Sequence, residues 1–183
     1  MSSRSSNNYR AITLSGLSGT GKSALFRNLK PHLEPLGYHF HAAGEFFRQT
    51  SGEFLHPTPE KLSDDFHRQT EDRLESFLRN EDHVVIDAWL GGFIAKDMPD
   101  VLRVLTYVSD PTERVRRYAR REKVSHEEAA AYIQDRDARN LAKWQELYGD
   151  YDFWDPEYYQ LRIDTAKLNH KECVKEVLDK LVI

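Results

Sequence analysis

Residues 16–23 read Gly-Leu-Ser-Gly-Thr-Gly-Lys-Ser. In the spacing G-x-x-x-x-G-K-S, glycine backbone curls around phosphate oxygens, and amide groups at a helix N-terminus point toward the negative charge. We expect Lys22 to reach the β- and γ-phosphates and the Ser23 hydroxyl to ligate Mg²⁺. The motif therefore predicts a site for ATP and Mg²⁺. The residues assigned to the nucleotide are Gly16, Ser18, Gly19, Thr20, Gly21, Lys22, Ser23 and Ala24.

The residues around this loop alternate between strand and helix patterns. An apolar strand is predicted at residues 10–15, and a helix follows at residues 21–33, where leucines recur every four residues. Further strands are predicted at residues 38–43, 83–88, 102–108 and 158–163. Further helices are predicted at residues 44–49 and 58–80, from Pro111, at residues 125–148 and from Asn169. Apolar strands that alternate with helices indicate an α/β fold whose parallel sheet is covered on both faces.

Three of these helices carry explicit start signals. Thr58, Pro59 and Glu60 read as an N-cap, a first-turn proline and a first-turn acid. Ser125 with Glu128, and Asn169 with Glu172, have the spacing of capping boxes. The helix after Thr58 is expected to turn an apolar stripe inward, formed by Leu62, Phe66, Leu74 and Phe77.

Length and composition limit the class of protein. The 183 residues are 39% hydrophobic, which suits one domain over residues 10–183, preceded by a Ser- and Asn-rich tail at residues 1–9 that we expect to be disordered. The formal net charge of −4 speaks against nucleic-acid binding driven by overall charge, and no apolar run approaches the length of a membrane span. The single cysteine, Cys173, suits a reducing cytoplasm. We expect a cytoplasmic monomer or homodimer.

Asp87 ends the apolar strand Val84-Val85-Ile86. A carboxylate at the carboxyl end of a parallel strand points toward the phosphate loop, where it is placed to hold a water molecule on Mg²⁺. A simple turn or N-cap aspartate is the alternative interpretation.

An arginine-rich stretch follows the fourth predicted strand. Its members are Arg114, Arg116, Arg117, Arg120, Arg121, Arg136 and Arg139. A mobile segment that carries arginines is one way to neutralise the charge that spreads over the transferred phosphoryl group. We assign Arg136 and Arg139 to catalysis, and Arg117 and Arg121 to the nucleotide. Interleaved acids leave open the alternative that any one of these arginines is paired on a solvated surface.

Beyond the phosphate loop, these residues resemble the small nucleoside monophosphate kinases, most closely the compact archaeal type of cytidylate kinase and its cytidylate kinase-like relatives. Residues 12–29 are similar to the first strand and phosphate loop of that family, and residues 44–48 to its acceptor segment. Residues 102–149 look like its fourth strand, arginine helix and lid, and residues 163–165 like its closing strand.

The resemblance implies a three-layer P-loop kinase fold with a five-stranded parallel sheet in the order 2-3-1-4-5. It also implies a helical acceptor-binding segment at about residues 44–80, an arginine-rich lid at about residues 113–149, and a contact between Arg48 and the acceptor phosphate. The implied acceptor residues are Gly44, Phe47, Arg48, Asp87 and Trp89.

The chain departs from the family after the third strand. Where the family reads acid-Gly-Arg, this sequence has Asp87-Ala88-Trp89. An indole cannot neutralise a phosphate, although it can stack on a base. A base-stacking role and a packing role for Trp89 therefore both stay open.

A nucleoside monophosphate brings its attacking oxygen already ionised, so its kinase needs positioning and charge neutralisation more than a general base. The sequence has many arginines, which can neutralise charge, and no recognisable histidine-containing triad that would supply a base. We expect phosphorylation of CMP or dCMP by ATP, with Lys22, Asp87, Arg136 and Arg139 as catalytic residues. Two alternatives stay open: a kinase for another small acceptor, with Asp87 or Glu45 as base, and a nucleotide-binding regulatory protein without turnover.

Overall fold

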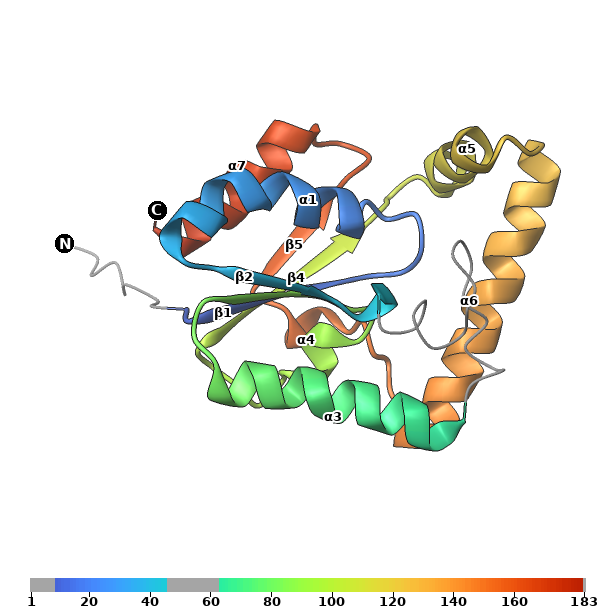
Figure 1. The fold of residues 1–183 in the computed structure, drawn as a ribbon. Helices are drawn as coiled ribbons and strands as arrows, with labels where there is room; N and C mark the ends of the chain where they lie inside the picture. Colours follow the sequence, from blue (N-terminus) through green and yellow to red (C-terminus); the bar gives the residue numbers. More distant parts are fainter. Residues whose placement is uncertain (1–8, 46–62, 183) are drawn as a thin grey trace.

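The computed structural model describes residues 9–45 and 63–182. Its centre is a five-stranded parallel sheet in the order β2-β3-β1-β4-β5 (Figure 1). This order confirms the one that the resemblance implies. The strands are β1 Ala11–Ser15, β2 His39–Ala42, β3 Val84–Asp87, β4 Val101–Tyr107 and β5 Leu161–Asp164.

Helices cover both faces of the sheet. Helices α1, Lys22–Leu33, and α7, His170–Leu181, lie on one face, and α3, Asp64–Asn80, and α4, Gly91–Ile94, lie on the other (Figure 1). Helices α5, Pro111–Glu122, and α6, His126–Tyr148, stand beyond the carboxyl ends of the strands. Two 3₁₀ turns are also described, η1 at Glu34–Leu36 and η3 at Pro156–Tyr158, and residues 43–45 after β2 are helical.

The strands alternate their side chains between two cores, as parallel strands buried on both faces must. Ile12 and Leu14 pack with Leu29 of α1 and Val177 of α7. Val84 and Ile86 pack instead with Leu74 and Leu78 of α3, along with other residues of that face. Both faces of the central strands are thus covered, and the carboxyl edge of the sheet is where a site can form.

A third group of buried side chains lies beside the sheet and is named here the aromatic cluster. Its aromatic members are Trp89, Phe93, Trp144, Tyr148, Tyr151, Phe153, Trp154 and Tyr158. It contains all three tryptophans of the chain. Phe153 is fully buried, so the aromatic segment before β5 packs against α4 and α6 rather than lying open on the surface.

Most element boundaries match the sequence-based prediction. Asn169 and Glu172 form the predicted capping box at α7, and Ser125 and Glu128 form the one at α6. Helix α5 starts after its cap Asp110, whose carboxylate accepts a hydrogen bond from the Thr112 amide. The 4-residue helix α4 was not predicted.

Two predictions need correction. Helix α3 starts at Asp64 rather than near Thr58, because Ser63 is extended and its hydroxyl accepts a hydrogen bond from the Phe66 amide. Its buried stripe is His67, Thr70, Leu74 and Leu78. Among the described members of the expected apolar stripe, Leu74 is buried, and Phe66 and Phe77 are partly buried. Residues 58–62, with the predicted cap at Thr58, lie outside the described residues.

The fifth strand also starts later than predicted, at Leu161, because Asp155 caps η3 just before it. Most of the expected disordered tail, residues 1–8, lies outside the described residues, and Tyr9 packs against the core under α1. No helix within residues 9–45 or 63–182 combines the length and the apolar character that a membrane span needs.

Candidate active site

The loop between β1 and α1 has the conformation that phosphate binding requires. Gly16, Gly19 and Gly21 have φ values of +137°, +79° and +89°, which disfavour residues with a Cβ. A Cβ on Gly16 would also overlap the carbonyl oxygen of Thr106. No side chain caps the N-terminus of α1, so its first amide groups point into the loop ready for an anion. These residues fit the triphosphate of ATP.

Three threonines brace this loop: Thr20 from within it, Thr106 from β4, and Thr165 from the turn after β5. The Thr20 hydroxyl donates to the Leu17 carbonyl at 2.9 Å and lies 2.8 Å from the Thr106 hydroxyl of β4. Beyond β5, the Thr165 hydroxyl donates to the Thr20 carbonyl at 2.8 Å. The Thr20 side chain, predicted to bind nucleotide, therefore holds the loop in shape.

Lys22 and Asp87 meet at the carboxyl edge of the sheet. The Lys22 ammonium donates to Oδ1 of Asp87, and the two residues are only 8% and 5% exposed. The register of the sheet brings them together, because β3 pairs directly with β1 and ends where the phosphate loop begins. Ser23, one residue further along α1, is exposed, so its hydroxyl is accessible to a ligand.

Both predicted lid helices contact Ser18 of the loop. Arg136 of α6 donates through Nη1 to the Ser18 hydroxyl at 3.0 Å. Arg114 of α5 donates through Nε to the Ser18 carbonyl and binds Asp137 through both terminal nitrogens, at 2.6 and 2.9 Å. The lid helices are thus joined to each other and to the phosphate loop by hydrogen bonds from charged groups, which are the stronger kind.

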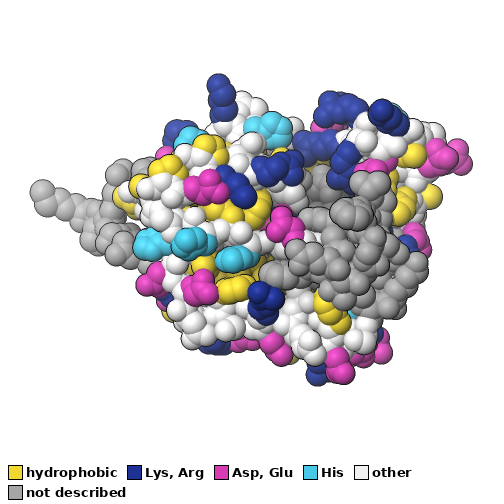
Figure 2. All heavy atoms as spheres, viewed as in Figure 1, with side chains coloured by type: hydrophobic (Ala, Val, Ile, Leu, Met, Phe, Trp, Pro, Cys, Tyr) yellow, Lys and Arg dark blue, Asp and Glu magenta, His cyan; other side chains and the backbone are white. Residues whose placement is uncertain are grey.

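Two other predicted arginines pair with neighbouring carboxylates. Arg139 pairs with Asp135 at 2.6 Å, with a side chain that is 39% exposed. Arg121 pairs with Glu122 at 2.6 Å. Figure 2 shows basic side chains gathered at the upper right of the molecule, where α5 lies in Figure 1. The exposed arginines of that helix are Arg116, Arg120 and Arg121.

Arg117 lines a hollow of about 410 Å³ between α1, α5 and the loop after β5. Its Nη1 donates to the Thr165 hydroxyl at 2.8 Å, and its Nε donates to Glu113 at 2.8 Å. Hydrogen bonds from Arg116 and Arg117 lower the pKa of Glu113 to about 2, so this acceptor stays ionised. The hollow adjoins Gly21 and is open at the start of α7, where it suits the base of a bound nucleotide.

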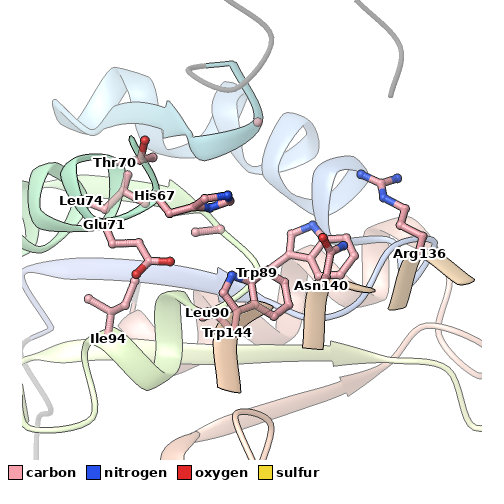
Figure 3. Close-up of a pocket in the computed structure, with 12 residues that line it drawn as sticks. His67, Thr70, Glu71, Leu74, Trp89, Leu90, Ile94, Arg136, Asn140 and Trp144 are labelled. Atoms are coloured by element: carbon pink, nitrogen blue, oxygen red, sulfur yellow. The ribbon is translucent and has the colours of Figure 1, made fainter. Parts of the chain in front are cut away.

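A second cavity, of about 90 Å³, lies between α3, α6 and the end of β3. Arg136, Asn140 and Trp144 project into it from successive turns of α6 (Figure 3). Figure 3 shows the α3 side chains on the opposite wall of the cavity. The remaining lining residues are Gly44, His67, Thr70, Glu71, Leu74, Ala88, Trp89, Leu90 and Ile94.

The cavity is apolar around a few polar groups. Burial raises the pKa of Glu71 to about 8, and the neighbouring Asp72 carboxylate adds to the rise, so Glu71 is largely protonated near neutral pH. Asn140 is 3% exposed and supplies an amide to the same wall as Arg136. A protonated carboxyl and an amide both donate and accept hydrogen bonds, as recognition of a base edge requires.

Some of the predicted acceptor residues reach this cavity. Gly44 and Trp89 line it, and Asp87 directly precedes Ala88 in its wall. Phe47 and Arg48 lie outside the described residues.

Sequence reasoning missed several residues that the structure places at the site. In the sequence, Arg114 had no feature that set it apart from the other arginines of its stretch. The sequence analysis also did not recognise that Asn140 and Trp144 share a helix face with Arg136. Their spacing of four residues on one helix was an available signal, since such residues share a face. Nothing in the sequence pointed to Glu71.

Mg²⁺ needs few protein ligands here. Within the part of the chain that the structure describes, no three His, Cys, Asp or Glu side chains converge to hold a metal ion. Mg²⁺ bound with a nucleotide keeps several water molecules and takes phosphate oxygens, so a hydroxyl and a nearby carboxylate suffice. The exposed hydroxyl of Ser23 and the carboxylate of Asp87 fit that requirement.

A phosphate loop with a buried lysine, an arginine of α6 that reaches the loop, and a mostly apolar cavity with a few polar groups beside that arginine are features of a P-loop kinase of small molecules. The model of the cytidylate kinase-like family matches residues 38–167. The chain belongs to this family and is an ATP-dependent kinase. Sequence relatives agree with the assignment, and similar solved structures share the fold.

Two relatives align with this chain over nearly their whole length. The chain is 31% identical over 176 residues to the cytidylate kinase of Ignicoccus hospitalis, covering 94% of this chain and 98% of that protein. It is 34% identical over 180 residues to the cytidylate kinase of Pyrococcus abyssi, covering 93% and 94%.

The similar solved structures show the fold alone. An uncharacterized protein from Eubacterium ventriosum has a TM-score of 0.72 at 14% identity, covering 94% of this chain and 98% of that one. A shikimate kinase from Acinetobacter baumannii has a TM-score of 0.60 at 16% identity, covering 99% and 97%.

Proposed function

We propose that this kinase transfers the γ-phosphoryl group of ATP to CMP or dCMP, which gives the nucleoside diphosphate and ADP. The oxygen of the acceptor phosphate attacks the γ-phosphorus, and the bond from that phosphorus to the β,γ-bridging oxygen breaks. The acceptor oxygen is already ionised, so the protein supplies position and positive charge rather than a base. The names of the archaeal relatives support this choice of acceptor.

The donor is held at the phosphate loop. The loop amides and Lys22 bind its phosphates, and the hollow beside Arg117 and Thr165 takes its base. Ser23 would ligate Mg²⁺ and Asp87 would hold one of its water molecules; the ion would supply positive charge that neutralises the phosphates. Lys22 leaves Asp87 for the phosphates as the nucleotide binds, because the triphosphate carries the greater negative charge.

The acceptor occupies the cavity between α3 and α6. Its phosphate lies toward Arg136, its base lies toward Glu71 and Asn140, and Arg48 of the acceptor segment completes the phosphate site. Residues 44–80 then form the acceptor-binding segment and residues 113–149 the lid, within one domain.

The observation that carries this proposal is the position of Arg136. It donates to Ser18 of the phosphate loop and also lines the acceptor cavity, so it lies on the boundary between donor and acceptor. A guanidinium at that boundary neutralises the phosphoryl group in transit between two phosphates.

The second candidate is transfer to a hydroxyl acceptor. It is favoured by Trp89, which replaces the family arginine that would help to hold an acceptor nucleotide. A hydroxyl must lose its proton, and a carboxylate near it would serve as the base.

An ADP-release assay with ATP and Mg²⁺ tests the proposal. The acceptors are CMP, dCMP, UMP, AMP and GMP, with shikimate and gluconate as hydroxyl compounds and with a no-acceptor control. We expect preferred turnover of CMP or dCMP, and we expect Lys22→Met to abolish it. Turnover of a hydroxyl compound without turnover of any nucleoside monophosphate would establish the second candidate instead.

A further inference from the structure

Trp89 stands at the junction of the phosphate loop, the lid and the acceptor cavity. Its carbonyl oxygen accepts hydrogen bonds from the Gly16 amide at 3.4 Å and from the Trp154 indole at 3.3 Å. Its ring lies against Trp144, with centroids 5.2 Å apart. The backbone of Trp89 is therefore fixed to the loop, and its ring is supported from within the aromatic cluster.

The same ring carries the guanidinium of Arg136. The Arg136 Cζ atom lies 5.3 Å from the centre of the Trp89 ring. This is the geometry of a cation–π contact, in which the ring quadrupole attracts the cation. Arg136 is thus held from two sides, by the Trp89 ring and by the Ser18 hydroxyl.

Arg136 differs from the lid arginines around it in its partners. Arg114, Arg117 and Arg139 each bind a carboxylate. Arg136 has no carboxylate partner within residues 9–45 and 63–182, and its Nε is buried without an acceptor there. Its charge is therefore not neutralised by the described part of the protein.

An aromatic ring and a carboxylate have different effects on a guanidinium that they hold in place. A carboxylate would hold a guanidinium firmly, but it would also cancel the positive charge and compete with phosphate for the same N–H groups. An aromatic ring orients the guanidinium and leaves both its charge and its in-plane donors available.

We propose that Trp89 is a positioning residue, whose indole ring holds the Arg136 guanidinium beside the phosphate loop without neutralising it. The inference deepens the proposed function, because it gives Arg136 a fixed place between donor and acceptor. It also argues against the base-stacking role that the sequence left open, since the ring then serves Arg136 and does not stack on the acceptor base.

Steady-state kinetics of Trp89→Leu and Trp89→Phe test the inference. Trp89→Leu removes the aromatic face and is expected to lower kcat about threefold to thirtyfold, the range of a cation–π contact, with little change in KM for ATP. Trp89→Phe keeps an aromatic face and is expected to retain most of the activity. Tyr151→Leu is the matched control, because Tyr151 belongs to the aromatic cluster, is 45% exposed and lies outside the cavity lining.

The decisive comparison is made in an Arg136→Met background. Trp89→Leu should cause no further loss of kcat there, because the group that it positions is already gone. An equal loss in both backgrounds would overturn the inference. So would a rise in KM for the acceptor at unchanged kcat, which would mean that the indole contacts the acceptor itself.

A measurement without substrates separates this inference from the proposed function. In a Trp144→Phe/Trp154→Phe protein, Trp89 is the single remaining fluorophore of its type. Arg136→Met should change its emission, because a cation beside the ring is removed; unchanged emission would overturn the inference. If the wild-type enzyme turned over no nucleoside monophosphate, only the proposed function would be overturned. The fluorescence emission would still decide the role of Trp89.

Discussion

Lys22 at the start of α1 and Asp87 at the end of β3 form a buried ion pair beside the phosphate loop. The pair keeps the lysine ordered next to the loop before any nucleotide is bound. Loss of either partner would leave the other as an unpaired charge in a largely buried position.

Removal of the lysine should therefore affect both activity and stability. Lys22→Met is expected to lower kcat by at least about 10²-fold, since one phosphate-stabilising charge is lost. It should also lower the free energy of unfolding by about 3–5 kcal/mol, because Asp87 is left unpaired. Kinetics and urea unfolding measure the two effects.

The double variant Lys22→Met/Asp87→Asn is the control for that experiment. It removes both charges, so it should regain most of the stability and none of the activity. If it unfolds as easily as Lys22→Met, the stability loss does not come from an unpaired aspartate.

The lid arginines should differ in their contributions to catalysis. Arg136→Met is expected to lower kcat by about 10²-fold or more, because Arg136 already lies at the phosphate loop. Arg139→Met should cause a smaller loss, because the Arg139 guanidinium must first leave Asp135. Arg116→Met on the exposed face of α5 controls for loss of positive charge. Equal losses for Arg136 and Arg139 would contradict the order that the geometry predicts.

Arg114 should hold the lid to the phosphate loop. Its side chain binds Asp137 through two nitrogens and also reaches the Ser18 carbonyl. Arg114→Ala is expected to lower the free energy of unfolding by about 1.5–3 kcal/mol, the range of hydrogen bonds to charged groups. It should also raise KM for ATP, because Ser18 loses a restraint.

Urea unfolding of Arg114→Ala and Arg116→Ala makes this comparison directly. Arg116 is exposed and pairs with Glu113 of the same helix, so its loss should cost no more than about 0.5 kcal/mol. Similar values for the two variants would show that the Arg114 contacts do not persist in solution.

Glu71 should make stability depend on pH. Burial raises its pKa to about 8, whereas an unfolded chain titrates its glutamates near about 4.3. Between about pH 5 and about pH 8 the native protein holds a proton that the unfolded chain has released. The free energy of unfolding should therefore fall as the pH rises, by up to about 1.4 kcal/mol per pH unit.

Glu71→Gln removes this titration and should flatten the dependence over the same range. Glu75→Gln on the same helix controls for the general loss of a carboxylate. Chemical unfolding at a series of pH values distinguishes the variants; a slope in Glu71→Gln as steep as in the wild type would assign the pH dependence to other groups.

Local patterns were enough to predict much of the fold. The phosphate loop, the five parallel strands and the capping boxes at Ser125 and Asn169 all depend on neighbours within a few residues. The start of α3 was misplaced, because Thr58-Pro59-Glu60 carries a start signal as strong as that of Ser63. Local patterns alone do not show which of two equally strong start signals begins the helix.

Local patterns did not predict the hydrogen-bond partners of buried polar residues. Arg103 lies in the middle of β4, where its guanidinium donates to the carbonyls of Met98 at 2.7 Å and Tyr158 at 2.6 Å. In the sequence it interrupts an apolar strand without any visible partner. Its acceptors become apparent only when the ends of α4 and of the aromatic segment are packed together.

By itself, the sequence determined that a phosphate loop joins the first strand of a parallel sheet to a helix, because glycine conformation, strand pattern and helix capping are local properties. Only the tertiary structure decided that Arg136, among the arginines of the lid, meets Ser18 and Trp89, and that Glu71 and Asn140 line one cavity. These residues lie far apart along the chain. Their contacts follow from how α3 and α6 pack at the edge of the sheet, which no pattern within one segment encodes.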